Sequence, residues 1–204
     1  ALDWLVQQQD RIEKRLVKER LSDGSMVLFD LTSTYLEGRQ CELAEYGYSR
    51  DHRPDRLQIE IGLLTDREGR PLAVRVFPGN TGDPKALSDQ VADLKKRYGL
   101  KRIIVVGDRG MVTQARIDAD LKPNGFSWIT ALRHSTIRKL AKEDAWPSLF
   151  DERNFAEITS PDFPDERLMV CRNPFLAEDQ ERSRRELLAV AEQELEKIRQ
   201  AVKE

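Results

Sequence analysis

The sequence predicts an α/β fold with a mixed sheet, in which three antiparallel strands come first and strands that alternate with helices follow. Two segments of alternating apolar and polar residues, 57–64 and 71–77, flank a polar stretch that contains a glycine, which is typical of a β-hairpin. The apolar run 26–29 predicts a third strand ahead of them. After the Pro- and Gly-rich cluster 78–84, helical and strand patterns alternate, which indicates crossover units.

Composition restricts the class of protein. The 204 residues are enough to bury a core, and they carry 34% charged residues with a net charge of −2, so any surface for nucleic acid has to be local. Cys41 and Cys171 lack the paired spacing of a zinc site or a disulfide framework. With no signal peptide pattern, they predict a reducing cytoplasm. No apolar run approaches the roughly 18 residues of a membrane span, so no membrane partner is expected.

The first half of the chain adds a helix and a long loop to the three strands. Apolar residues at helical spacing predict an amphipathic helix over 2–21 that packs on the core. The polar loop 37–55 interleaves aromatic side chains with basic ones, among them Arg50 and Arg53. Such a loop either contacts phosphates and bases or is only solvated, and the residues by themselves leave both interpretations open.

The second half alternates helices with short strands. A helix that starts near Asp83 and Pro84 is closed by Gly99. Further patterns predict, in order, a strand at 103–106, a helix at 113–121, a strand at 126–132, a helix at 135–142, and two short strands at 155–159 and 167–171.

The last segment, 176–204, is predicted to be a highly charged helix. Its apolar residues are spaced three and four apart, which is typical of a coiled-coil seam. Because only two heptads are visible, a solvated helix packed against its own domain is at least as good an interpretation as a homodimer. The seam consists of Leu188, Ala191, Leu195, Ile198 and Val202.

Two acidic residues stand at the ends of apolar strand patterns. Asp30 follows the run 26–29, and Asp108 follows the run 103–106 with a glycine on either side of the Asp108–Arg109 pair. Each carboxylate by itself could close a strand by capping backbone amides. If the two strands are neighbours, however, the carboxylates converge at one edge and offer oxygen ligands to Mg²⁺ or Mn²⁺.

Several motifs in the same order resemble the DDE transposases of bacterial insertion sequences, and the resemblance is close to the insertion-sequence-four type over essentially the whole chain. It implies a ribonuclease-H-like catalytic fold, with the first catalytic Asp on the first strand and the second after the fourth strand. Asp30 and Asp108 fall on these positions. The motifs are the segments 1–15, 29–38, 47–50, 76–84 and 106–111.

One part of the family pattern is missing. The family carries its third acid, a Glu, on a late helix within a pattern of Tyr, Arg, Glu and Lys, and no Tyr follows Tyr98 here. Glu186 and Glu192 therefore do not qualify by motif. We expect the third acid beyond Glu204, which would make this chain a fragment that is inactive on its own.

The resemblance also sets expectations for organisation and partners. It implies an N-terminal helix over 1–24, an incomplete ribonuclease-H-like core over 25–142, the start of an inserted β segment over 143–175, and the charged helix over 176–204. In the complete enzyme, Asp30 and Asp108 would hold two Mg²⁺ or Mn²⁺ ions with the missing Glu. The partners would be transposon ends and target DNA, contacted through Arg50, Arg53 and Arg109, in a nucleoid-associated bacterial protein.

A second class of function stays open from the residues. The absent third acid and the lack of a basic excess also fit a non-catalytic remnant of a transposase that binds DNA or pairs through its last helix. A phosphatase with an aspartyl nucleophile is disfavoured, because Thr32 stands where a second Asp is needed, and a phosphate-binding Gly-rich loop is absent.

Overall fold

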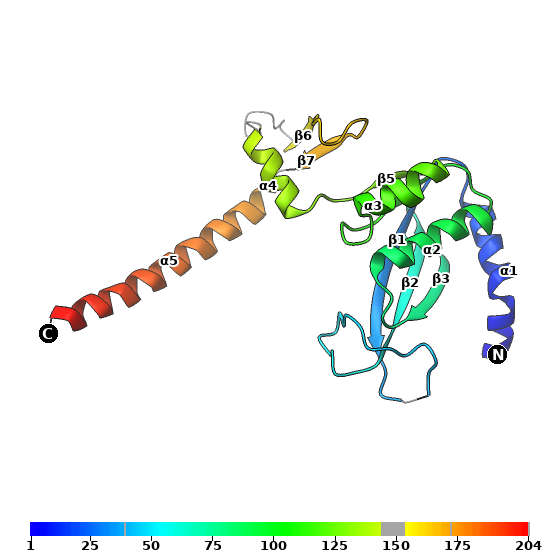
Figure 1. The fold of residues 1–204 in the computed structure, drawn as a ribbon, viewed down its shortest axis with the longest axis horizontal. Helices are drawn as coiled ribbons and strands as arrows, with labels where there is room; N and C mark the ends of the chain where they lie inside the picture. Colours follow the sequence, from blue (N-terminus) through cyan, green and yellow to red (C-terminus); the bar gives the residue numbers. More distant parts are fainter. Residues whose placement is uncertain (39, 144–153, 172, 204) are drawn as a thin grey trace. The chain divides into compact units, whose positions relative to one another are not determined.

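The computed structural model describes residues 1–38, 40–143, 154–171 and 173–203. Contacts between backbone positions divide the chain into two units, 1–133 and 134–204. The first unit contains a five-stranded sheet with its helices, and the second contains a hairpin and two helices (Figure 1). Within the described residues, no helix is long and apolar enough to cross a membrane.

The sheet of the first unit has the strand order β3-β2-β1-β4-β5. Strand β1 pairs antiparallel with β2, which pairs antiparallel with β3, whereas β1–β4 and β4–β5 are parallel pairs. This arrangement confirms the predicted mixed sheet, with a meander of three strands before the crossover connections. It is the order of a ribonuclease-H-like fold. The strands are β1 Ser25–Tyr35, β2 Gln58–Asp66, β3 Pro71–Pro78, β4 Ile103–Val106 and β5 Ser127–Ile129.

Three helical segments accompany this sheet. Helix α1 covers Leu2–Arg20, and α2 covers Asp83–Lys96 with a proline in its first turn, where the missing N–H is not needed. The helix expected at 113–121 is divided, because a short α3, Gln114–Arg116, continues as a π-helical turn, Ile117–Leu121. A 3-10 turn at Lys122–Asn124 then leads into β5.

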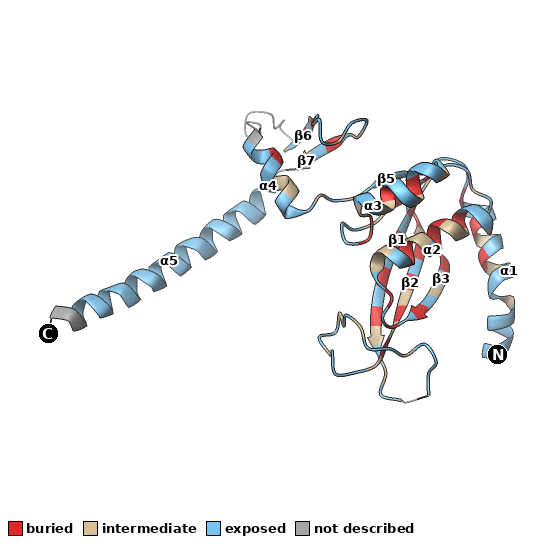
Figure 2. Cartoon of the chain, viewed as in Figure 1, coloured by how far each residue is buried: buried red, intermediate tan, exposed pale blue. Residues whose placement is uncertain are grey.

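One face of the sheet forms the core. In β1 the side chains of Val27, Phe29 and Leu31 are buried, and they belong to one cluster with Leu87 and Val91 of α2 (Figure 2). This follows from the two-residue period of a strand, which sends alternate side chains to one face. Helix α2 therefore covers this face of the sheet.

The opposite face is half exposed. Asp30 and Leu28 project to it from β1, together with Leu63 of β2 and Val76 of β3, and the three apolar residues are 36–47% exposed. The acid that the sequence singled out thus lies on the face that α2 leaves open.

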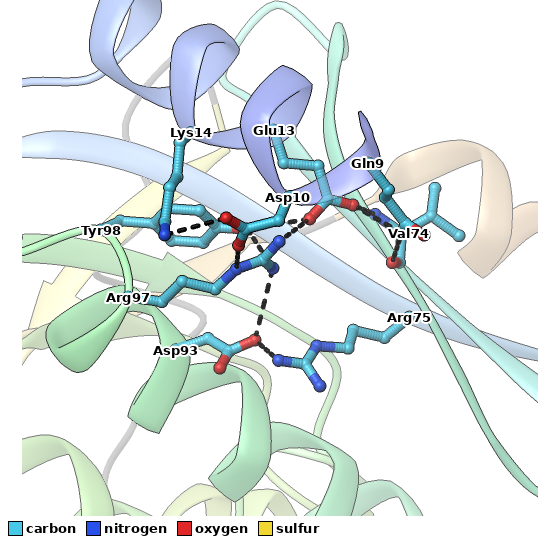
Figure 3. A network of polar contacts seen from close by, with 9 residues as sticks. All are labelled: Gln9, Asp10, Glu13, Lys14, Val74, Arg75, Asp93, Arg97 and Tyr98. Atoms are coloured by element: carbon cyan, nitrogen blue, oxygen red, sulfur yellow. Dashed lines mark hydrogen bonds and ion pairs between the residues drawn. The ribbon is translucent and has the colours of Figure 1, made fainter. Parts of the chain in front are cut away.

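Helix α1 closes the outer edge of the sheet. Strand β3 is an edge strand, and its Val74 N–H donates to Oε1 of Glu13 (3.1 Å), while Nε2 of Gln9 donates to the Val74 carbonyl (3.1 Å) (Figure 3). Unpaired edge groups invite pairing with other chains. The two side chains of α1 therefore satisfy backbone groups that no further strand covers.

The second unit begins at His134, with helix α4. Helix α4, His134–Glu143, which the prediction assigned to the core, lies in this unit. Strands β6, Phe155–Ile158, and β7, Leu168–Cys171, form an antiparallel hairpin in the region predicted to be an inserted β segment. Residues 144–153 of that segment lie outside the described residues.

Helix α5, Pro174–Lys203, is the long charged helix expected at the end of the chain. Leu188, Leu195 and Ile198 of its predicted seam are 56–65% exposed. These three side chains do not pack against the described residues of their own unit, and pairing of the seam with a second copy remains a prediction.

Candidate metal and DNA site

Asp30 lies in the middle of its strand, which corrects the prediction that it ends the strand. Strand β1 continues to Tyr35, and it stays paired with β2 along this extension. The reason is that the alternation of buried and exposed positions does not stop at Asp30, because Leu31 and Ser33 return to the covered face. At the level of Asp30, the parallel partner strand β4 has already ended, because its last paired residue is Val106 opposite Leu28.

The sheet brings Asp30 and Asp108 to the same level. The parallel register pairs Leu28 with Val106. A Cβ atom placed on Gly107 would lie 3.7 Å from the Phe29 carbonyl oxygen, so the two chains still run side by side one residue later. One further step along each chain reaches Asp30 and Asp108. The expected adjacency of the two strands that carry the acids is therefore present.

Asp108 is held by a tight turn. Its Oδ1 accepts hydrogen bonds from the backbone N–H groups of Gly110 (2.9 Å) and Met111 (2.7 Å). Asp108 is exposed, and its Oδ2 makes no hydrogen bond or ion pair within the described part of the chain. The capping role that the sequence left open is real, and it occupies only one of the two oxygens.

The residues present suit a hard divalent cation in part. Asp30 is exposed and uses Oδ1 to accept its neighbour's N–H, which leaves lone pairs of both carboxylates accessible. Oxygen donors are the ligands that Mg²⁺ and Mn²⁺ prefer. Among the described residues, no three His, Cys, Asp or Glu side chains gather as a metal-binding group. The chain thus offers two carboxylates for a cation that keeps several waters.

Arg50 makes two ion pairs, one of them with an acid close to the Asp108 turn. Its Nη1 lies 2.7 Å from Oε2 of Glu60, and its Nη2 lies 2.5 Å from Oδ1 of Asp83. Its backbone N–H also donates to Oγ of Ser33 (3.0 Å). Burial by itself lowers the pKa of the Arg50 guanidinium, but the two carboxylates outweigh it and raise that pKa. We call Arg50, Glu60 and Asp83 the arginine clamp.

The arginine clamp ends next to the Asp108 turn. A Cβ atom on Gly110 would lie 3.4 Å from Oδ1 and 3.8 Å from Oδ2 of Asp108, and 3.6 Å from Oδ2 of Asp83. The two carboxylates therefore flank the same small space, which a glycine leaves free. Asp83 begins α2, and the dipole of that helix favours a negative charge in its first turn.

The other two predicted DNA contacts differ in their surroundings. Arg53 is paired with Asp55 through two hydrogen bonds of 3.1 and 3.2 Å, and its guanidinium lies 5.4 Å from the ring centre of Tyr35. Arg109 is exposed and forms no ion pair within the described part of the chain. In that part of the chain, Arg109 is therefore available for the DNA contact that the resemblance implied.

Sequence reasoning missed two residues of this region. Glu60 lies on β2 at a buried position, 2% exposed, and Asp83 had been interpreted only as part of a helix start. A signal for Glu60 was available. The alternation of β2 places it on the same face as Gly62 and Leu64, where a lone carboxylate requires a partner. Nothing in the sequence indicated that the partner is Arg50.

The sequence matches one family of known proteins over most of its length. A family model described as the transposase DDE domain matches residues 21–188. No curated protein matches the chain. Among solved structures, part of the chain is similar to a piggyBac transposase in a synaptic complex with hairpin DNA, with a TM-score of 0.42 and 16% identity over 61% of this chain and 27% of that chain.

A second similar structure is the Mos1 transposase in a paired-end complex with the left transposon end. The TM-score is 0.34 and the identity 12%, over 72% of this chain and 56% of that chain. Both TM-scores are below 0.5, so the similarity in fold is weak. The chain spans only part of each of these proteins. The family match stands independently of them and covers most of the chain. The chain belongs to the transposase DDE domain family.

Proposed function

We propose that this chain supplies the first two catalytic carboxylates of a DDE transposase, Asp30 and Asp108, for phosphodiester cleavage and strand transfer in DNA. The observation that carries the proposal is the parallel pairing of β1 with β4, which brings these two residues to one level of the sheet in a member of this family. An insertion-sequence-four type is compatible with the family match. A homodimer and an association with the bacterial nucleoid belong to the same proposal.

Each reaction is an in-line displacement at phosphorus, in which negative charge builds up on the attacking and leaving oxygens. Divalent cations, when bound, stabilise that charge. In this chain, Asp30 and Oδ2 of Asp108 would hold them, and the N–H groups of Gly110 and Met111 fix the orientation of the Asp108 carboxylate. A third carboxylate from another part of the protein would complete the set.

Arg109 is the best candidate in this chain for a phosphate contact. It is exposed, it follows Asp108 directly, and no carboxylate in the described residues neutralises it. Arg53 is a second candidate for a phosphate contact. Its exposed ion pair with Asp55 contributes little to stability, so a phosphate can replace the carboxylate. Phosphate contacts of this kind position DNA without reading its sequence.

The alternative is a DNA-binding or coiled-coil module without catalysis. It is favoured because no three metal-binding side chains gather at one point among the described residues, and because the seam residues Leu188, Leu195 and Ile198 of α5 are exposed. This alternative predicts DNA binding or self-association that does not depend on the two acids or on a divalent cation.

Binding of Mn²⁺ to the chain tests the proposal. At Mn²⁺ concentrations about ten times the Kd, binding should stabilise the wild type by about 1.4 kcal/mol in denaturant titrations, since the native state alone binds the ion. Asp108→Asn keeps the cap of the turn but loses the charge, so it should lose this increment. Asp89→Asn is the matched control, because Asp89 is an exposed Asp on α2 outside the site.

Two results distinguish the functions. Equal stabilisation of the wild type and of Asp108→Asn by Mn²⁺ would exclude the assigned cation site and leave the binding module. Loss of the response in both Asp30→Asn and Asp108→Asn, with the Asp89→Asn response intact, would support the proposal.

A further inference from the structure

The arginine clamp joins parts of the chain that are far apart in sequence. Arg50 comes from the loop between β1 and β2, Glu60 from β2, and Asp83 from the first turn of α2. Glu60 is 2% exposed and also accepts a hydrogen bond from Nε2 of Gln58 (3.1 Å). A carboxylate buried this deeply is costly unless it is paired, so Arg50 is held firmly at this end.

The other arm of Arg50 fixes Asp83. This carboxylate is only half-buried and would otherwise be free to turn toward water. With Oδ1 bound to Arg50, its Oδ2 stays at the space beside Gly110, opposite both oxygens of Asp108. The clamp therefore determines how close a second negative charge stays to the Asp108 turn.

The neighbouring charge matters for a bound cation. A Mg²⁺ or Mn²⁺ ion held by few carboxylates keeps several water ligands, and nearby carboxylates that accept hydrogen bonds from such waters orient the site and strengthen it. Asp83 has one oxygen available in this position. Its usefulness depends on Arg50, because only the paired carboxylate is held in place.

We propose that Arg50 is a positioning residue on the Asp108 side of the proposed cation site, because it bridges buried Glu60 to Asp83 and so holds Asp83 against the Asp108 turn. This inference rests on the proposed function. It assigns Arg50 a role different from the DNA contact that the sequence suggested, since both of its arms are engaged inside the protein.

Arg50→Lys separates the two roles. A lysine keeps the positive charge and would serve as a phosphate contact, but its single ammonium lacks the planar fork that bridges two carboxylates. If Arg50 is a positioning residue, the Mn²⁺ affinity of Arg50→Lys should fall about tenfold, as is typical when a supporting partner of a metal ligand is lost. Arg56→Lys is the matched control, because Arg56 is an exposed arginine of the same loop whose ion pair in the described part of the chain is with exposed Asp55.

The experiment measures Mn²⁺ affinity by calorimetry for the wild type, Arg50→Lys, Arg56→Lys and Asp108→Asn. Each titration is run at a temperature well below the midpoint of thermal unfolding of that protein. A loss of stability alone then does not change the measured affinity. The inference is supported if Arg50→Lys binds Mn²⁺ about tenfold more weakly than the wild type while Arg56→Lys binds it as well as the wild type does. If Arg50→Lys binds Mn²⁺ with wild-type affinity, the inference is wrong. The proposed function still stands in that case if Asp108→Asn weakens Mn²⁺ binding.

A second variant keeps the test valid if Arg50→Lys does not fold. Asp83→Asn leaves the buried Glu60–Arg50 pair intact and removes only the charge beside the Asp108 turn. It should also weaken Mn²⁺ binding several-fold, whereas Asp89→Asn on the same helix should not. Equal affinities of these two variants would overturn the inference, and absence of any Asp108-dependent binding in the wild type would overturn the proposed function with it.

Discussion

Two buried glutamates of the first unit each pair with one arginine, and the two pairs end differently. Glu13 of α1 lies 2.6 Å from Nη2 of Arg97, and Glu60 of β2 lies 2.7 Å from Nη1 of Arg50. The exposed fractions of the two glutamates are 5% and 2%. The chemistry of the pairs is thus nearly the same, although they lie in different parts of the unit.

The surroundings of the two glutamates explain what each pair does. Glu13 also accepts from the Val74 N–H of the edge strand and from the Tyr98 hydroxyl, and Arg97 continues from Glu13 to Asp10 of α1 (2.7 Å) and Asp93 of α2 (3.8 Å) (Figure 3). Arg50 instead passes from Glu60 to Asp83, which stands beside the Asp108 turn. The first pair closes a sheet edge, whereas the second connects the core to a candidate site.

The largest effect is expected at the edge pair. Glu13→Ala leaves the Val74 N–H without its acceptor and removes one carboxylate from Arg97, which keeps Asp10, so about 2 kcal/mol of unfolding free energy should be lost. Denaturant titrations measure this loss, and Mn²⁺ affinity should stay at the wild-type value. Glu19→Ala, which breaks only an exposed pair on α1, is the control and should change stability by less than about 0.5 kcal/mol. A loss of Mn²⁺ affinity in Glu13→Ala would show that the two pairs are not separate in function.

A smaller effect is expected for the tyrosine of the same network. Tyr98→Phe removes a hydroxyl that accepts from Nη1 of Arg97 (2.8 Å) and donates to Glu13 (3.3 Å), which should cost about 1 kcal/mol at neutral pH. Burial, followed by the charge of Glu13, raises the pKa of Tyr98 to about 12.

The same substitution has a pH signature. Because the folded-state pKa of Tyr98 lies above its ordinary value of 10, the folded protein disfavours the tyrosinate. The contribution of Tyr98 to stability is therefore fully present below about pH 10 and is lost as the pH rises toward 12. Unfolding free energies across this range should fall more steeply for the wild type than for Tyr98→Phe. Parallel curves would contradict the buried position of this hydroxyl.

The smallest effect is expected at the clamp. Burial raises the pKa of Glu60 above its ordinary value of 4.5, while the charge of Arg50 and its hydrogen bond oppose the shift. With a raised folded-state pKa, the contribution of Glu60 to stability is present below about pH 4.5 and is lost as the pH rises through the folded-state pKa. The stability of the wild type relative to Glu60→Gln should therefore decrease with rising pH above 4.5. An increase would mean that Arg50 outweighs burial and holds the pKa of Glu60 below its ordinary value.

Local patterns accounted for most of the fold. The alternation at 57–64 and 71–77 predicted β2 and β3, and the turn cluster with Pro84 predicted the start of α2. These predictions succeed because strand period, turn residues and helix ends depend on neighbours in the sequence. The position of Asp108 after β4 was predicted for the same reason.

Long-range pairing decided the features that the sequence missed. The end of β1 was misplaced at Asp30, because the strand is extended by pairing with β2 and not by its own apolar run. Arg50 looked like a loop residue available to DNA, since its partners Glu60 and Asp83 are brought to it only by the folded sheet and the first turn of α2.

The sequence by itself therefore determined the order of the elements and the family, and it singled out Asp30 and Asp108 as candidate site residues. Only the tertiary structure decided which charges neutralise one another. The physical reason is that an ion pair needs two side chains within about 4 Å, and Arg50 and Asp83, which are 33 positions apart in the sequence, give no local signal of that approach. Arg109, which the fold leaves unpaired within the described residues, and Arg50, which it clamps, are indistinguishable until the chain is folded.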